Sequence, residues 1–231
     1  MDLGVLELTI RVGLVATAIN LPIALGVSWL IVKKRIPGAF VLDALVSLPL
    51  ALPPVAIGFF LLLALGREGP LGSLSRSMFG SDLVFTWVAA ALASAVVSFP
   101  LLVRPIMVAM GEVDERLEMT ARSLGAGPVR VAFTITLPLA YRGLLAGLLL
   151  GFVRAISEFG ATITVAGNIP GKTQTLPLAI FSSVQLRKDG EALQLIGISV
   201  LLALATLLVH NWLLGRSAKR NAGGGRGRGP L

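Results

Sequence analysis

The chain has 231 residues, of which 55% are hydrophobic and only 14% are charged, and its mean hydropathy is +0.86. A soluble domain usually carries about 25% charged residues, so this composition excludes a free cytosolic protein and favours one that lies in a bilayer. The absence of cysteine and the single histidine, His210, exclude disulfides, thiol catalysis and a histidine-rich metal site. The net charge of +8 would by itself suggest nucleic acid or anionic lipid as a partner.

Long charge-free runs indicate where the chain crosses the bilayer. The hydrocarbon core is roughly 30 Å thick, so a helix needs about 20 apolar residues to span it. Four runs meet this condition, and a fifth is interrupted only by Arg154 and Glu158, which are four residues apart and can pair on one helix face. The charge-free segment 173–186 is shorter and is predicted to be an interfacial or re-entrant helix. The expected transmembrane helices cover residues 12–32, 44–66, 83–103, 143–166 and 192–214.

The distribution of basic residues predicts how these five helices are oriented. The loops after the first and third spans and the C-terminal segment hold 13 of the 20 lysines and arginines. Cytoplasmic segments are enriched in these residues, so we expect the N-terminus outside and the C-terminus inside. The predicted fold class is an all-α polytopic membrane protein, with a transmembrane domain over 1–215 and a flexible basic cytoplasmic tail over 216–231. Topology and anionic lipid then account for the charge, and no nucleic-acid partner is expected.

The second span contains an unusual number of prolines, which predicts an irregular backbone at membrane depth. Proline lacks the N–H that continues a helix, and irregular backbone in a bilayer is tolerated where it is buried in protein or lines a cavity. We therefore predict a translocation pathway or gate around 47–58, a plain proline kink being the alternative. The predicted pathway or gate residues are Ser47, Pro53, Pro54, Ser98, Ser157, Glu158 and Thr162.

The fourth span contains two further patterns. Arg154 and Glu158 are predicted to form a buried ion pair that positions residues 157–164 beside the pathway, because ionisable groups in a membrane are usually paired. Small residues recur every four positions from Gly143 to Ala155. This stripe predicts close helix packing, with pore lining as the alternative.

Residues 166–173 (AGNIPGKT) fit a relaxed phosphate-loop pattern, which we reject. A true phosphate loop follows a buried strand and surrounds the phosphates with backbone N–H groups, whereas this segment follows a membrane span on the expected outer side. Pro170 also removes one of the required donors. Any ATP that drives this protein is therefore expected on another chain.

The longest inside segment, 111–140, is amphipathic and charge-mixed. Helix-forming residues occupy 118–124, glycines and a proline follow at 125–128, and a second apolar run covers 129–137. Glycine allows a tight turn and proline starts a new helix well. We predict two short helices joined by a glycine turn, projecting into the cytosol, with an ordinary interfacial linker as the alternative.

This segment resembles the cytoplasmic EAA loop of the membrane subunits of binding-protein-dependent ABC importers. That pattern has a glycine, nine intervening residues and then Ile-x-Leu-Pro, which Gly125, Ile135, Leu137 and Pro138 match. The leading Glu-Ala-Ala would fall on 119–121, with an acid one place early. The resemblance implies that the loop couples the chain to an ATPase subunit through Glu118, Ala121, Gly125, Ala126, Gly127, Ile135, Leu137 and Pro138.

A wider resemblance covers residues 12–212 and is carried by three stretches. SLPLALPPVAIGF at 47–59, SFPLLVRP at 98–105 and the EFGATI segment with the following NIPG within 156–180 are similar to the molybdate-type permeases. The resemblance implies a type I ABC importer permease in the cell (inner) membrane, assembled from two copies of this chain, two ATP-binding cassette subunits and an extracytoplasmic oxyanion-binding protein. It implies no catalytic residue, metal or cofactor on this chain, since ATP-Mg is bound by the partner.

The expected function is inward translocation of molybdate by alternating access, driven by ATP hydrolysis in the partner. Tungstate and sulfate or thiosulfate remain alternative substrates, because they are similar tetrahedral oxyanions. A stand-alone secondary transporter or channel is the alternative from a different class. A polytopic membrane enzyme is not expected, since the five spans lack clusters of Asp, His or Lys.

Overall fold

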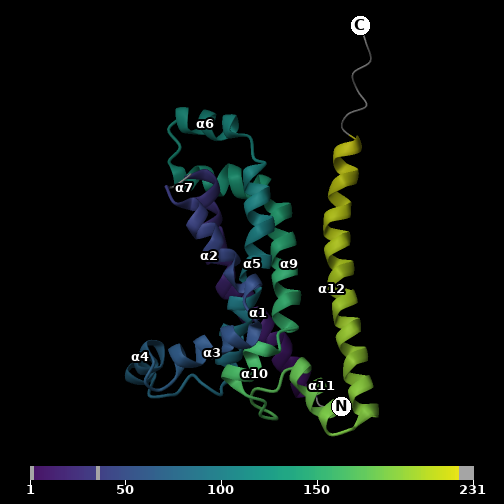
Figure 1. Cartoon of the computed structure of the whole chain (residues 1–231). Coiled ribbons are helices and arrows are strands. Elements are labelled where there is room, and N and C mark those ends of the chain that lie inside the picture. The colour runs from purple at the N-terminus through teal and green to yellow at the C-terminus, as the bar shows by residue number, and fades with distance from the viewer. Residues whose placement is uncertain (1–2, 35–36, 224–231) are drawn as a thin grey trace.

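A computed structural model describes residues 3–34 and 37–223, which form helices joined by loops and turns. Figure 1 shows long helices side by side, with short helices gathered at each end. The elements in chain order are α1 (Leu3–Ser28), η1 (Trp29–Lys33, a π-helix), α2 (Ala39–Ala51), α3 (Pro54–Leu65), α4 (Pro70–Phe79), α5 (Trp87–Gly111), α6 (Glu115–Ser123), α7 (Pro128–Val131), η2 (Ala132–Thr136, a π-helix), α8 (Leu137–Leu139), α9 (Tyr141–Ile156), α10 (Gly160–Ala166), α11 (Leu176–Gln185) and α12 (Asp189–Gly223).

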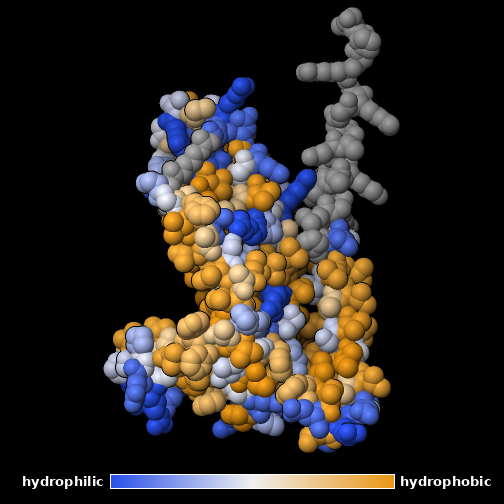
Figure 2. All heavy atoms as spheres, in the orientation of Figure 1, coloured by the Kyte–Doolittle hydropathy of each residue, from blue (hydrophilic) through white to orange (hydrophobic). Residues whose placement is uncertain are grey.

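Helix α5 lies at the centre of the bundle. It begins at Thr86, whose hydroxyl oxygen accepts a hydrogen bond from the Ala89 N–H at 3.3 Å and so caps the first turn. The alanines of its first half are buried, and α1, α2, α3, α9 and α10 all pack against it. Most of the visible surface over the long helices is hydrophobic, with a few hydrophilic patches midway and more hydrophilic residues towards the ends (Figure 2). The core therefore follows α5.

Helix α9 packs closely on α5 through the small-residue stripe. A Cβ added at Gly147 would overlap the carbonyl oxygen of Leu102, and one at Gly151 would lie 2.8 Å from the Leu102 Cβ. Between helices in lipid there is no hydrophobic driving force, so such close backbone approach supplies the packing energy. The stripe therefore faces α5, as the packing interpretation predicts.

The expected second span is two helices rather than one. Helices α2 and α3 meet at Leu52 and Pro53 with a bend of 110°. The Leu52 N–H still donates to the Leu48 carbonyl at 3.2 Å, but Pro53 and Pro54 have no N–H to continue the ladder. Pro54 instead occupies the first position of α3, where its missing donor costs nothing. The prolines thus turn the chain, so that α3 leaves the direction of the bundle (Figure 1).

The expected fourth span, 143–166, is also divided. Helix α9 ends at Ile156 and α10 begins at Gly160. A second bend, of 75°, separates Pro128–Leu139 from α9. By length and composition, three described helices can cross a bilayer, and five crossings result if each bent pair counts as one.

The C-terminal part begins with α11, which lies within the segment predicted to form a short helix. The expected fifth span lies within α12, and only 6% of its most apolar stretch is buried by the rest of the chain. Helix α12 continues to Gly223 and so includes the first part of the expected tail. Residues 224–231 and the side chain of His210 lie outside what the structure describes.

We expect Gly147→Ala to destabilise the protein by about 1–3 kcal/mol, because the new methyl group overpacks the contact with α5. The melting temperature of the detergent-purified protein measures this. The matched control is Gly197→Ala in α12, where an added Cβ meets nothing within 4 Å. Equal melting temperatures for the two variants would contradict the close contact of α5 with α9.

Candidate functional site: coupling loop and transport pathway

The segment between α5 and α9 folds into a compact projection, which we call the knob (α6 to α8, residues 115–139). Asp114 caps α6, since its Oδ1 accepts from the Arg116 N–H at 2.9 Å. After α6 the chain reverses at Gly125, whose φ of +87° favours glycine, and Pro128 then starts α7. The structure thus contains the predicted pair of short helices and glycine turn. The second helix continues through Pro138 to Leu139, because proline is tolerated in the first turn of α8.

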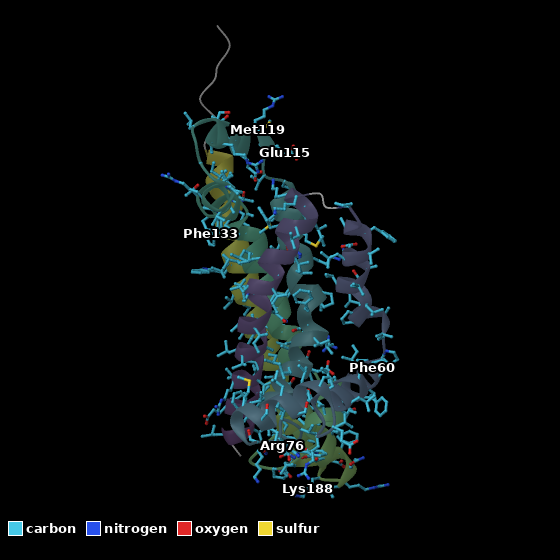
Figure 3. All side chains as sticks on the ribbon, turned by 90° about the vertical axis from the view of Figure 1, so that its left-hand side faces the viewer. Phe60, Arg76, Glu115, Met119, Phe133 and Lys188 are labelled. Carbon is cyan, nitrogen blue, oxygen red and sulfur yellow. The ribbon has the colours of Figure 1, made fainter. Side chains whose placement is uncertain are left out.

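The outer face of the knob exposes large apolar side chains. Leu124 is 84% exposed, and Met119, Val129 and Phe133 are also exposed. Figure 3 places Glu115 and Met119 at the α6 end of the molecule and Phe133 on its flank. Among the predicted coupling residues, Gly125, Gly127 and Pro138 are exposed, Ala121, Ala126, Ile135 and Leu137 are half-buried, and Glu118 is buried. The exposed apolar side chains give this face the character of a protein contact.

Glu118 anchors the knob to the bundle. It is 4% exposed, and its Oε1 lies 3.0 Å from Lys33 Nζ and accepts a hydrogen bond from Thr136 Oγ1 at 2.7 Å. Lys33 also donates to the Val113 carbonyl at 3.2 Å. Arg122 Nη2 lies 3.9 Å from the other carboxylate oxygen. Glu118 therefore faces inward and fixes α6 against η1 and η2, rather than presenting its charge on the surface.

Both principal partners of Glu118 were missed by sequence reasoning. Lys33 is the last residue of η1 and Thr136 is the last residue of η2. Isolated π-helical turns recur at functional sites because they redirect side chains. The only sequence signal was a basic residue directly after the first span, which we used for orientation alone.

The two interrupted spans meet at the opposite end of the bundle. A Cβ at Gly58 in α3 would lie 2.7 Å from the Ala161 carbonyl oxygen, and one at Gly160 would lie 3.0 Å from the Pro54 Cβ. Helices α3 and α10 are thus in close contact just after their respective breaks. Pro54 is half-buried in this contact, whereas Pro53 and Ser157 are exposed.

The predicted ion pair occupies the break between α9 and α10. Arg154 Nη2 lies 2.7 Å from Glu158 Oε2, and Glu158 Oε1 accepts from the Ala161 N–H at 2.8 Å. The buried Glu158 thus neutralises Arg154 and also satisfies one free N–H group in the first turn of α10. Thr162, one turn further, is fully buried, and its hydroxyl has no hydrogen-bond partner among the described residues.

The two remaining pathway candidates lie apart from this junction. Ser98 is fully buried where α5 meets α1, and its hydroxyl oxygen accepts from Asn20 Nδ2 at 3.2 Å. Asn20 also donates to the Ala95 carbonyl at 2.8 Å, so Ser98 belongs to a packed helix contact. Ser47 lies on α2 and accepts a hydrogen bond from Arg104 of α5. The pathway candidates therefore lie in three places: the junction of the interrupted spans, the contact of α1 with α5, and the contact of α2 with α5.

The phosphate-loop lookalike has a different structure from a nucleotide-binding loop. It follows helix α10, and the fully buried hydroxyl of Thr173 accepts from the Ile169 N–H at 3.0 Å and donates to the Gly167 carbonyl at 3.3 Å. The loop therefore closes on its own threonine.

Comparison with known proteins agrees with the architecture of the bundle and knob. The family described as "binding-protein-dependent transport system inner membrane component" matches residues 20–219. The chain belongs to this family. It is thus a multi-pass inner membrane protein and a permease subunit of an ABC importer.

Individual relatives cover nearly the whole permease. The chain is 43% identical to the molybdenum transport system permease protein ModB of Haemophilus influenzae, over 95% of this chain and 96% of the relative. It is 45% identical to the ModB protein of Escherichia coli K12, over 92% and 93%. The crystal structure of a bacterial ABC transporter that imports the acidic polysaccharide alginate has a chain of the same fold, with a TM-score of 0.72, 14% identity and coverage of 93% and 79%.

We expect Lys33→Met to destabilise the permease by about 3–5 kcal/mol, because it leaves the buried Glu118 carboxylate without its cation. The melting temperature and hydrogen exchange over residues 115–123 measure this. Replacing both Lys33 and Glu118 by Met should restore much of the stability, since no unpaired charge remains.

The control for this prediction is the neighbouring Lys34→Met. Lys34 Nζ lies 4.8 Å from the centroid of the Trp29 ring, a contact worth about 0.5–1 kcal/mol. Equal losses of stability in the Lys33 and Lys34 single variants would show that the buried Glu118 does not need Lys33 as its partner.

Proposed function

We propose that this permease translocates molybdate inward by alternating access, driven by ATP hydrolysis in two partner subunits, with the N-terminus outside and the C-terminus inside. The choice of molybdate as substrate is supported by the 43–45% identity, over more than nine tenths of the chain, to proteins named as molybdenum transport permeases. A tetrahedral dianion cannot cross hydrocarbon without a shielded path. The polar and irregular positions within the spans are where such a path would lie.

The knob is the proposed contact with the ATPase. Its outer face combines exposed Leu124, Val129 and Phe133 with the flexible-backbone turn at Gly125. Apolar residues of this size fill pockets at protein interfaces and dominate their binding energy. The inward anchoring of Glu118 makes the knob rigid, so that a push on its outer face would move α5, α9 and the end of α1 together.

The proposed gate is the junction of the two interrupted spans. The α2–α3 bend supplies Pro53 and Pro54, and the α9–α10 break supplies Ser157 and Glu158. Short helices on either side of a break can turn about that break, whereas a continuous span cannot. Thr162, with its unsatisfied buried hydroxyl, lies in the helix that would move.

A second copy of the chain is proposed to complete the pathway. Helix α12 has most of its apolar surface uncovered by its own chain, so lipid and a neighbouring subunit would cover it. An extracytoplasmic oxyanion-binding protein would deliver the substrate to the end opposite the knob. The ATPase activity of the purified complex tests the whole proposal, because binding protein loaded with molybdate should stimulate it. Stimulation only by sulfate-loaded binding protein would show that the substrate is sulfate.

We expect Leu124→Asp to weaken association with the ATPase subunit at least about 30-fold, as loss of a central interface residue does. Co-purification of the two subunits measures this. Leu186→Asp is the matched control, because Leu186 is also a highly exposed leucine but lies between α11 and α12. Unchanged co-purification of the Leu124 variant would remove the knob from the interface.

We expect Glu158→Gln to abolish most uptake by the reconstituted complex while leaving assembly intact. The amide can still accept from the Ala161 N–H, but it leaves Arg154 without a counter-charge beside the gate. Glu191→Gln is the control, since Glu191 forms an exposed pair with Lys188. Wild-type uptake by the Glu158 variant would show that the ion pair plays no part in transport.

A further inference from the structure

Arg104 and Asp43 form an ion pair between helices α5 and α2. The sequence did not predict this pair. Arg104 lies on α5, directly after the predicted span 83–103, but the helix continues to Gly111 and is as a whole long and apolar enough to cross a bilayer. Its Nη1 lies 3.0 Å from Asp43 Oδ1 on α2, and its Nη2 donates to Asp43 Oδ2 at 3.2 Å. Nη2 also donates to Ser47 Oγ. Only the Nη2 contact has the geometry of a hydrogen bond, because Asp43 Oδ1 is buried and has no hydrogen-bond partner among the described residues, so the contact of Nη1 with Oδ1 is an ion pair alone.

The pair is not enclosed by the bundle. The Arg104 side chain is 44% exposed and that of Asp43 is 32% exposed. Ionisable residues at membrane depth face the protein interior or a water-filled space, because exposure to hydrocarbon is costly. Arg104 lines a groove of about 930 Å³ that runs between α5 and the start of α9. Arg104 therefore contacts both this groove and Asp43, whereas Asp43 is not among the residues that line the groove.

The charges in this groove are arranged along its length. Arg104 is seven residues inside the end of α5, whereas Glu112 and Asp114 line the groove beyond that end, close to the knob. Arg142, at the start of α9, also lines it. An anion would thus meet Arg104 as the cation farthest from the knob, whereas near the knob Glu112 and Asp114 stand beside Arg142 and offset its charge.

Arg104 retains donors for a further ligand. A guanidinium has five N–H groups, and the contacts with Asp43 and Ser47 use only those of Nη1 and Nη2. A tetrahedral oxyanion accepts hydrogen bonds from a guanidinium in the same geometry as a carboxylate. An arriving oxyanion would first accept from these remaining N–H groups, and it would then compete with Asp43 for the charge and the Nη hydrogen bonds of the same guanidinium.

We propose that Arg104 is a transient binding site for the translocated oxyanion in the knob-side half of the pathway, and that Asp43 is a built-in competitor that keeps this binding weak. The inference rests on the proposed oxyanion transport. Conduction requires that a site attract the ion and still release it. A tethered carboxylate on the same guanidinium provides the release, because it takes back the hydrogen bonds as the substrate leaves.

The test is equilibrium binding of molybdate to the complete transporter, without nucleotide or binding protein, in a detergent with uncharged sugar headgroups. Asp43→Asn keeps an acceptor for Arg104 but removes the competing charge, so molybdate should bind about fivefold more tightly, with slower uptake. Arg104→Gln should weaken binding about tenfold or more. Asp82→Asn is the matched control, because Asp82 pairs with Arg76 and Arg67 outside the spans and should leave binding unchanged.

The opposite directions of the two shifts are the decisive result. If the pair only holds α2 against α5, both substitutions break the same contact and shift molybdate binding in the same direction or not at all, which overturns the inference. A phospholipid headgroup offers the same chemistry as the free oxyanion. If phosphatidylglycerol displaces molybdate and Asp43→Asn tightens lipid binding instead, the site belongs to lipid and the inference is also overturned.

Uptake by the wild-type complex separates this inference from the proposed function. If reconstituted wild-type transporter with its binding protein imports no tetrahedral oxyanion, the proposed function fails. If it imports molybdate but the two variants shift binding in the same direction, only the role of Arg104 and Asp43 fails.

Discussion

The close approach of α9 to α5 is the contact on which the rest of the architecture depends. Glycines at every fourth position let the α9 backbone reach the side chains and a carbonyl oxygen of α5, at a distance where dispersion forces replace the absent hydrophobic effect. The knob connects the end of one of these helices to the start of the other, at Gly111 and Tyr141. Its base is therefore held as firmly as the two helices hold each other, and motion of the knob becomes motion of the central pair.

Local patterns in the sequence predicted most helices and the turn of the knob, but they contain no information on contacts between distant segments. Charge-free runs located α1, α5 and α12, and the residues at 125–128 located the turn of the knob. The pairing of Arg154 with Glu158 followed from a spacing of four on one helix. By contrast, Asp43 and Arg104 are 61 residues apart, and no periodicity links them. Hydropathy also counts apolar residues without direction, so it could not divide 44–66 into two helices.

The buried acids follow one physical scheme. Glu118 and Glu158 each accept from a cation and from one further donor, the Thr136 hydroxyl in the first case and the Ala161 N–H in the second. A buried carboxylate is tolerated only when its charge and its lone pairs are both satisfied. In each case the second donor belongs to a short helical segment, η2 for Thr136 and α10 for Ala161. The carboxylate that pairs with the cation therefore also holds this short segment in place.

The sparse contacts of α12 have a consequence for how the protein is made. The glycine contact, the anchor of the knob and the junction of the interrupted spans involve only residues that precede α12 in the chain. Because synthesis proceeds from the N-terminus and early parts fold first, each of these contacts is available before the ribosome has finished the last helix. The final span is thus added to a completed core, and its uncovered face is the last apolar surface of the chain's spans to enter the bilayer.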